Sequence, residues 1–377
     1  MIWKFCRAVV VLAWGSVGIS MAAAETIRIA VIDPFSGPAA LQGEMGSRHI
    51  QMAVDDINAR GGVLGGTKLE LVLLDNKSSP QESLVVLKQA IDQNIRLITQ
   101  GVGSHVAHAM TDAILKYNQR NPGREILYLN NGATDTVLTE EKCNFWHFRF
   151  EANLDMKIDA LTGVLSRQKA AKKLYMLNPD YAYGHSFKRV AREMLEKKRP
   201  DIEIVGDELI PLGKVKDFAP YVAKIKSSGA DTVLTGNWGS DLALLIKSAE
   251  DAGLNATFYT NYGFLVGTPR VFGAAGANRV KTVAGWNANI AGHPLERYSL
   301  DYKKRFKEDW GFMPYKYFVE MLARAIDKAG SADPVQIAKA LEDMRYDADD
   351  TGYGWKSDVR IEAKDNILPT TCKMERP

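Results

Sequence analysis

The segment Gly101–Val106 is the part of the sequence whose glycine spacing most directly suggests chemistry. It reads Gly-Val-Gly-Ser-His-Val, follows an apolar strand and begins a helix, which is the context of a dinucleotide-binding motif. The third glycine of that motif is missing, and the first strand of the chain lacks the motif altogether, so we predict no nucleotide cofactor. Free N–H groups at a helix N-terminus bind anions, and the segment is therefore a candidate site for an acidic group.

Two histidines of this helix, His105 and His108, lie three residues apart and could share a metal ion. No paired carboxylate or third ligand accompanies them, so a place at the surface or at a helix end is the favoured interpretation, and we predict no metal site. The chain contains no G-x-S-x-G, H-E-x-x-H or C-x-x-C motif. We therefore predict no catalytic residues and a role in binding.

The composition is that of a multidomain globular protein. The chain has 377 residues, of which 46% are hydrophobic and 25% charged, and this excludes a disordered or low-complexity chain. Its 48 basic and 45 acidic residues give a formal net charge of +3, so no strong field attracts nucleic acid or an anionic membrane. Because no basic stripe runs between the aromatic residues, we predict no nucleic-acid partner.

The first 24 residues have the three parts of a secretory signal peptide. Lys4 and Arg7 form a basic start, Ala8–Ile19 is apolar, and Ala22–Ala24 supplies the small residues of a cleavage site. The alternative is an N-terminal membrane anchor, but the apolar run is shorter than the roughly 20 residues that a spanning helix needs. The sequence thus predicts an exported protein that begins at Glu25.

Cleavage would remove Cys6, which lacks the preceding apolar stretch that lipid attachment requires, and would leave Cys143 and Cys372. An even pair of cysteines in an exported chain predicts one disulfide, because the compartment is oxidising. Two unrelated buried thiols are the alternative.

Strands and amphipathic helices alternate along the rest of the chain. The first strand covers Ile27–Ile32, and the next helix carries an apolar stripe from Ile50 to Ile57. This alternation continues to about Leu129 and restarts after about Glu151, and helices dominate from Pro294 to Met344. Alternation of this kind is typical of parallel sheets covered on both faces, and it predicts two α/β lobes joined by short crossings.

A set of short motifs in fixed order gives the chain a family resemblance. The motifs are Ile32–Pro38 (IDPFSGP), Ala53–Gly66 (AVDDINARGGVLGG), Asn131–Thr134 (NGAT), Asp180–Gly184 (DYAYG), Lys216–Phe218 (KDF) and Ser228–Asp231 (SGAD). In this order and spacing they resemble the leucine/isoleucine/valine-binding family of periplasmic solute receptors of ABC importers. The resemblance covers essentially the whole mature chain.

The resemblance implies an α/β fold of two Rossmann-like lobes, the type I periplasmic binding protein fold. Three hinge segments would join the lobes, and the ligand would lie in the cleft between them. We expect residues 25–150 and 286–350 to form the first lobe, and residues 151–285 and 351–377 to form the second.

The resemblance also implies a ligand site. Ser104 and Thr134 match positions whose hydroxyls bind a ligand carboxylate, with the backbone of Gly132 and Ala133 beside them. Tyr183 matches an aromatic position of the second lobe, and Trp238 another, although plain core packing is the alternative for both. The candidate ligand-binding residues, which include a first-loop glutamine where the family often has an aromatic residue, are Gln42, Ser104, Gly132, Ala133, Thr134, Tyr183, Trp238 and Tyr262.

Tyr262 marks a departure from the family. Amino-acid binders place a glutamate at the matching position, after the short strand Phe258–Thr260, where it holds the ligand's ammonium. A buried cation without an acidic partner costs several kcal/mol. Either another acid such as Asp241 or Glu44 takes its place, or the ligand lacks the ammonium group.

Together these features predict a periplasmic receptor, monomeric and without cofactors, that delivers a small carboxylate-bearing solute to an inner-membrane ABC permease. The solute would be a branched-chain or other hydrophobic amino acid, or an aromatic or other organic acid. A ligand sensor on the same fold is the alternative function.

Overall fold

The computed structural model of the chain describes residues 26–265, 267–286, 292, 295–342, 344–347 and 358–360. The predicted signal peptide and Cys372 lie outside these residues. Within them the chain forms two five-stranded parallel sheets, each covered by helices, so the predicted α/β fold with two Rossmann-like lobes is confirmed. None of the described helices is both long and apolar enough to span a membrane.

The first lobe is built on the N-terminal sheet, whose strand order is β2-β1-β3-β4-β5. Its strands are β1 (Thr26–Asp33), β2 (Lys68–Asp75), β3 (Leu97–Gln100), β4 (Leu127–Asn130) and β5 (His147–Arg149). Its first helices are α1 (Ala40–Ala59), α2 (Pro80–Asp92) and α3 (Ser104–Arg120), followed by the 3₁₀ turn η1 (Thr136–Thr139). Ile29, Val31 and Ile32 of β1 are fully buried, as expected of a central strand covered on both faces.

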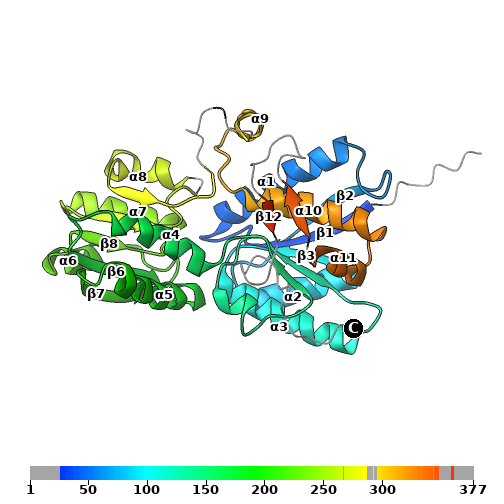
Figure 1. Cartoon of the computed structure of the whole chain (residues 1–377), viewed down its shortest axis with the longest axis horizontal. Helices are drawn as coiled ribbons and strands as arrows, with labels where there is room; N and C mark the ends of the chain where they lie inside the picture. The colour runs from blue at the N-terminus through cyan, green and yellow to red at the C-terminus, as the bar shows by residue number, and fades with distance from the viewer. Residues whose placement is uncertain are drawn as a thin grey trace, which may run out of the picture.

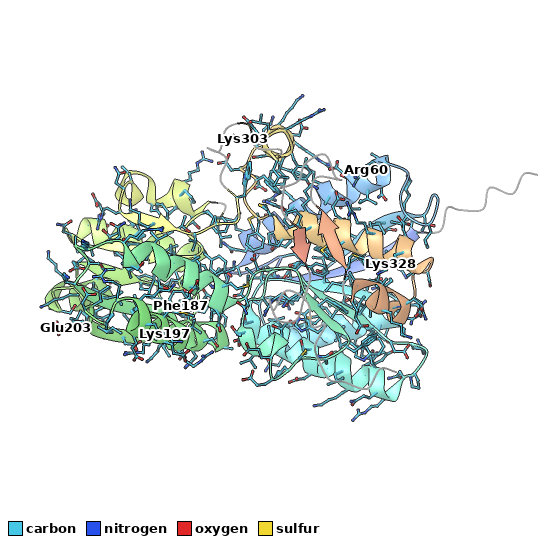
Figure 2. The ribbon with its side chains drawn as sticks, in the orientation of Figure 1. Arg60, Phe187, Lys197, Glu203, Lys303 and Lys328 are labelled. Carbon is cyan, nitrogen blue, oxygen red and sulfur yellow. The ribbon has the colours of Figure 1, made fainter. Side chains whose placement is uncertain are left out.

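The second lobe is built on a sheet of order β10-β9-β8-β6-β7 and lies beside the first in Figure 1. Its strands are β6 (Lys173–Pro179), β7 (Glu203–Ile210), β8 (Thr232–Leu234), β9 (Thr257–Thr260) and β10 (Val280–Thr282). Its helices are α4 (Leu154–Ser166), α5 (Ala182–Lys198), α6 (Ala219–Ser227), α7 (Gly239–Asp251) and α8 (Thr268–Gly276). Phe187 lies buried inside this lobe, whereas Lys197 and Glu203 lie on its exposed outer side (Figure 2).

The C-terminal helices return to the first lobe. After α9 (Glu296–Phe306), helix α10 (Pro314–Ala329) packs against α1, and α11 (Pro334–Leu341) packs against α10 and β4 (Figure 1). Strand β11 (Arg345–Asp347) then pairs antiparallel with β12 (Asp358–Arg360). This pairing joins a segment that we expected in the first lobe to one that we expected in the second.

Candidate functional site

A pocket lies where the two lobes meet. It brings together every candidate ligand-binding residue that the sequence suggested: Gln42, Ser104, Gly132, Ala133, Thr134, Tyr183, Trp238 and Tyr262. Eight further lining residues were not among those candidates: Met45, Gly101, Val102, Gly103, Tyr181, Leu265, Phe312 and Tyr315. The sequence contained a signal for Gly101, Val102 and Gly103, because their segment is a candidate anion site, and for Tyr181, because it belongs to the DYAYG motif. Nothing in the sequence pointed to the other four residues, Met45, Leu265, Phe312 and Tyr315.

The pocket forms at the carboxyl ends of parallel strands. Ser104 is the first residue of α3 and follows β3, and Thr134 follows β4. In the second lobe Tyr183 lies in the first turn of α5 after β6, Trp238 precedes α7 after β8, and Tyr262 follows β9. Because the carboxyl ends of parallel strands share one edge of a sheet, residues far apart in sequence converge here, as ligand sites of open α/β sheets do.

A buried carboxylate holds the turn between β3 and α3. Asp33 Oδ1 accepts hydrogen bonds from the N–H groups of Gly101 at 3.1 Å and Val102 at 2.8 Å. Burial raises the pKa of the Asp33 carboxyl to about 7, although these two donors oppose the shift. Gly103 follows with φ +94°, a conformation that side chains disfavour, and begins the helix without a side-chain cap.

This turn leaves hydrogen-bond donors free at the N-terminus of α3. The N–H groups of Val106 and Ala107 both donate to Gly103 O, and those of Ser104 and His105 have no partner among the described residues. Ser104 Oγ accepts a bond of 3.3 Å from Asp135 N, so its own hydrogen remains available. Donors of this kind, at the positive end of a 17-residue helix, suit a carboxylate.

The backbone N–H groups of Gly132 and Ala133 are paired within their own turn. Both N–H groups already donate to the side chain of Asn130, at 3.1 Å and 2.8 Å from its Oδ1. Asn130 caps this turn from within, because its Nδ2 also donates to Ala133 O. Gly132 and Ala133 therefore contribute surface to the pocket, and their N–H groups are already paired within the turn.

Aromatic side chains of the second lobe form the opposite wall. Tyr183 is 1% exposed, and its hydroxyl donates to Asn261 Oδ1 at 2.9 Å, so its ring and not its hydroxyl is offered to the pocket. Trp238 is 8% exposed, and its Nε1 donates to Tyr181 Oη at 3.0 Å. The ring centroids of Tyr181 and Tyr183 lie 5.7 Å apart, and those of Tyr183 and Tyr262 lie 5.9 Å apart. These contacts fix the rings as a continuous apolar surface.

Among the described residues that line this pocket, none is an aspartate, glutamate, lysine or arginine. The two acids considered as substitutes for the missing glutamate lie elsewhere. Asp241 Oδ2 accepts a bond of 2.8 Å from Gly213 N, and Glu44 is exposed and lies 3.6 Å from Arg48 Nη1. Neither lines the pocket, so neither can meet a ligand ammonium directly.

One ammonium group lies behind the aromatic wall. Lys157 Nζ lies 3.2 Å from Glu151 Oε1, 5.1 Å from the centroid of the Tyr262 ring and 5.7 Å from that of Phe312. Burial alone would lower the pKa of Lys157, but the charge of Glu151 and its contact with Lys157 raise it above its usual value. Burial raises the pKa of Tyr262, against the effect of Lys157. Lys157 therefore stays charged and paired with Glu151, and Tyr262 stays neutral.

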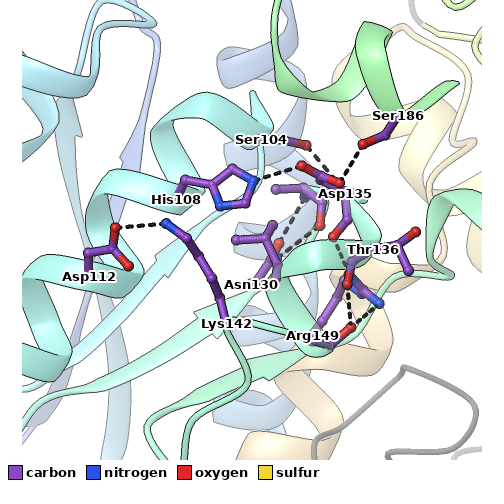
Figure 3. Close-up of polar contacts among 12 residues, drawn as sticks. Ser104, His108, Asp112, Asn130, Asp135, Thr136, Lys142, Arg149 and Ser186 are labelled. Atoms are coloured by element: carbon purple, nitrogen blue, oxygen red, sulfur yellow. Dashed lines mark hydrogen bonds and ion pairs between the residues drawn. The ribbon is translucent and has the colours of Figure 1, made fainter. Parts of the chain in front are cut away.

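Asp135, next to Thr134, connects the lobes. Its Oδ1 accepts a bond of 2.9 Å from Ser186 Oγ of α5, and its Oδ2 lies 2.7 Å from His108 Nε2 (Figure 3). Burial raises the pKa of Asp135, but the bonds from His108 and Ser186 outweigh it and the pKa lies below its usual value. The side chain of His108 is therefore engaged by Asp135. The described residues contain no group of three or more potential metal ligands.

A family model described as periplasmic binding protein matches residues 26–371. The Leu/Ile/Val-binding protein homolog 4 of Brucella melitensis is 32% identical over 350 residues, which are 90% of this chain and 83% of that protein. A closed structure of the leucine-, isoleucine-, valine-, threonine- and alanine-binding protein of Brucella ovis is similar with a TM-score of 0.77 and 29% identity, and the match covers 92% of this chain and 88% of that one. An ABC-transporter solute-binding protein of R. palustris in complex with benzoate shares the fold, with a TM-score of 0.76, 20% identity and coverage of 85% and 86%.

Proposed function

The chain belongs to the periplasmic binding protein family of the leucine/isoleucine/valine-binding type, and we propose that its pocket binds a small aromatic or apolar carboxylic acid that lacks an ammonium group. Members of this family bind small solutes and work with ABC permeases; they are not enzymes. We further propose that this chain is exported to the periplasm, acts as a monomer and delivers its ligand to such a permease.

The proposed ligand class rests on the groups that line the pocket. They suit the carboxylate of an amino acid but offer no ionic partner to its ammonium group. The free hydrogen of Ser104 Oγ and the unpaired N–H groups at the start of α3 suit a carboxylate. Among the described residues no acidic side chain lines the pocket, and the acid nearest to the Tyr262 side of the wall, Glu151, is already paired with Lys157 at 3.2 Å. A buried ammonium would thus lose its hydration without gaining an ionic partner, which costs several kcal/mol.

The apolar part of the ligand would lie among Tyr183, Trp238, Tyr262 and Phe312. Aromatic rings favour such an environment through stacked and edge-to-face contacts. The benzoate complex of the R. palustris protein supports this choice, because it is a carboxylate on a ring bound by the same fold.

A branched-chain amino acid is the second candidate, and one contact favours it. Gln42 is 6% exposed, and its Oε1 is buried without a partner among the described residues. This oxygen could accept a hydrogen bond from an ammonium group, and the names of the Brucella relatives point the same way. An amide oxygen is a weaker partner for a cation than a carboxylate, so we rank this candidate second.

Isothermal titration calorimetry with matched pairs of acids tests the proposal. Phenylalanine and 3-phenylpropanoate differ only in the ammonium group, as do leucine and 4-methylpentanoate. We expect each deaminated acid to bind at least tenfold more tightly than its amino acid. A preference for the amino acids would refute the proposed ligand class and favour the second candidate, and turnover of any ligand would contradict the binding role.

A further inference from the structure

A second cavity lies beside the pocket. We call it the outer chamber: it is lined by Lys77 and His105 of the first lobe, by Lys214 and Asp241 of the second, and by Tyr181 and Trp238. It differs from the inner pocket in character, because charged side chains line it from both lobes.

Tyr181 and Trp238 are the only described residues that line both cavities. The hydrogen bond of 3.0 Å from Trp238 Nε1 to Tyr181 Oη joins their side chains. The Tyr181 ring also contacts two other rings. Its centroid lies 5.7 Å from that of Tyr183 and 5.0 Å from that of His105, which it meets edge-on. The pair is therefore a fixed partition between an apolar pocket and a polar chamber.

Both members of the partition belong to the second lobe, Tyr181 just before α5 and Trp238 just before α7. Movement of the lobes would carry them together and leave their hydrogen bond intact. The partition therefore keeps its own geometry when the lobes move, and closure of the lobes sets its distance from the start of α3.

We propose that the Tyr181–Trp238 pair sets the maximum length of the ligand. This inference rests on the proposed function in one respect only, that an acid is anchored at the start of α3. An acid short enough to end at the partition fits, whereas a longer rigid acid collides with the two rings. Removal of either ring joins the cavities and gives a longer acid access to the outer chamber.

The chemistry of the chamber indicates which longer acids would gain most. Lys77 and Lys214 bring one ammonium from each lobe, and Asp180 and Asp241 bring two carboxylates from the second lobe. Lys77 Nζ lies 3.2 Å from Glu82 Oε2, Asp180 Oδ1 lies 2.8 Å from His185 Nε2, and Asp241 Oδ2 accepts a hydrogen bond from Gly213 N. Lys214 has no ion-pair partner among the described residues, so a second, distal carboxylate could pair with it.

The test compares benzoate with biphenyl-4-carboxylate and biphenyl-4,4′-dicarboxylate by calorimetry. We expect Trp238→Ala to bind biphenyl-4-carboxylate at least tenfold more tightly than the unsubstituted protein does, and to bind benzoate more weakly. The dicarboxylate should gain further, and Lys214→Ala in the Trp238→Ala background should remove that additional gain. Tyr181→Ala opens the partition from its other side and gives an independent variant should Trp238→Ala fold poorly.

Leu265→Ala is the matched control, because Leu265 lines the inner pocket and not the outer chamber. An equal gain in Leu265→Ala, or no gain in either partition variant, overturns the proposal. If amino acids prove to be the ligands, phenylalanine replaces benzoate and 4-phenylphenylalanine replaces biphenyl-4-carboxylate. The same variants then test the length limit. Failure of the ligand class and failure of the length limit are thus separate results.

Discussion

Ser186 Oγ of the second lobe donates a hydrogen bond of 2.9 Å to Asp135 Oδ1 of the first lobe. His108 holds the other oxygen of the same carboxylate at 2.7 Å, and Asp135 is 2% exposed (Figure 3). The donor and the acceptor lie on opposite sides of the cleft, next to the pocket residues Tyr183 and Thr134. Any rotation that parts the lobes must break this bond, so it stabilises the closed form.

The first prediction is that Ser186→Ala weakens ligand binding without altering the pocket. A hydrogen bond to a charged group contributes roughly 1.5–3 kcal/mol, part of which water would replace in the open form. We therefore expect a loss of affinity of at least threefold by calorimetry and a larger radius of gyration by small-angle scattering. Ser227→Ala is the control, because Ser227 Oγ bonds within its own helix. Unchanged affinity in Ser186→Ala would show that the bond does not contribute to closure.

The convergence of the candidate residues could be predicted because each is tied to a local signal. Ser104 and Tyr183 lie in the first turn of a helix, and Thr134 and Tyr262 follow a strand. A strand–helix alternation locates such turns from sequence alone, and parallel pairing brings them to one edge. Helix α7 begins at Gly239, so Trp238 is the residue that directly precedes it.

The remaining walls of the pocket depend on contacts between distant segments. Phe312 and Tyr315 reach it because α10 packs against α1, an arrangement that no local pattern encodes. The capture of two backbone N–H groups by Asn130 was also beyond prediction. A motif shows which residues lie in a turn, but the choice of their hydrogen-bond partners depends on the side-chain conformation that packing selects.

The second prediction concerns Asp33 and pH. Its pKa is raised from 3.8 to about 7 in the folded protein, so between these values the folded state binds the proton more tightly than the unfolded state. Ionised Asp33 therefore destabilises the folded state. Asp33 does not lower the free energy of unfolding below pH 3.8, but it lowers it increasingly up to about pH 7, by roughly 4 kcal/mol at most. Asp33→Asn removes this titration and retains an acceptor for Gly101 and Val102.

We therefore expect the stability of Asp33→Asn relative to the unsubstituted protein to rise between pH 4 and 7 and to level off above pH 7. Urea unfolding at a series of pH values measures this difference. If this difference does not change with pH, the pKa of Asp33 is the same in the folded and unfolded states.

The third prediction is the disulfide. Cys143 lies shortly before β5, whereas Cys372 lies outside the described residues. If the exported chain loses residues 1–24, these two cysteines are the only ones left, and we expect a bridge between them. Intact-mass analysis with alkylation should show a chain that begins at Glu25 and takes up alkyl groups only after reduction. Two alkylated thiols in unreduced material would disprove the bridge, and a chain that retains Met1 would disprove cleavage.

The fourth prediction addresses Tyr262, the position where the family has its glutamate. Tyr262→Glu places a carboxylate on the pocket wall and should raise the affinity for leucine relative to 4-methylpentanoate by at least tenfold. The gain has a limit, because Lys157 Nζ lies 5.1 Å from the Tyr262 ring and would attract part of the new charge. Tyr262→Gln is the uncharged control of equal length. If the ratio of leucine affinity to 4-methylpentanoate affinity changes equally in both variants, the loss of the Tyr262 ring causes the effect.

The fifth prediction separates the carboxylate anchor from the aromatic wall. Ser104 Oγ has a free hydrogen, and a hydrogen bond to a charged group contributes roughly 1.5–3 kcal/mol, so Ser104→Ala and Thr134→Val should each weaken binding of an acid by about tenfold or more. Both side chains are buried, and Ser104 Oγ also accepts a bond from Asp135 N, so lost affinity alone could reflect a distorted turn.

Benzamide resolves this ambiguity, because it has the shape of benzoate without the charge. If the hydroxyls act on the charge, both substitutions should reduce benzoate binding far more than benzamide binding and so narrow the ratio between the two ligands. Thr136→Val is the matched control, because the Thr136 hydroxyl bonds to Asp155 outside the pocket. An equal loss for benzoate and benzamide would mean that Ser104 and Thr134 only shape the turn, and the N–H groups at the start of α3 would then remain as the donors to a ligand anion.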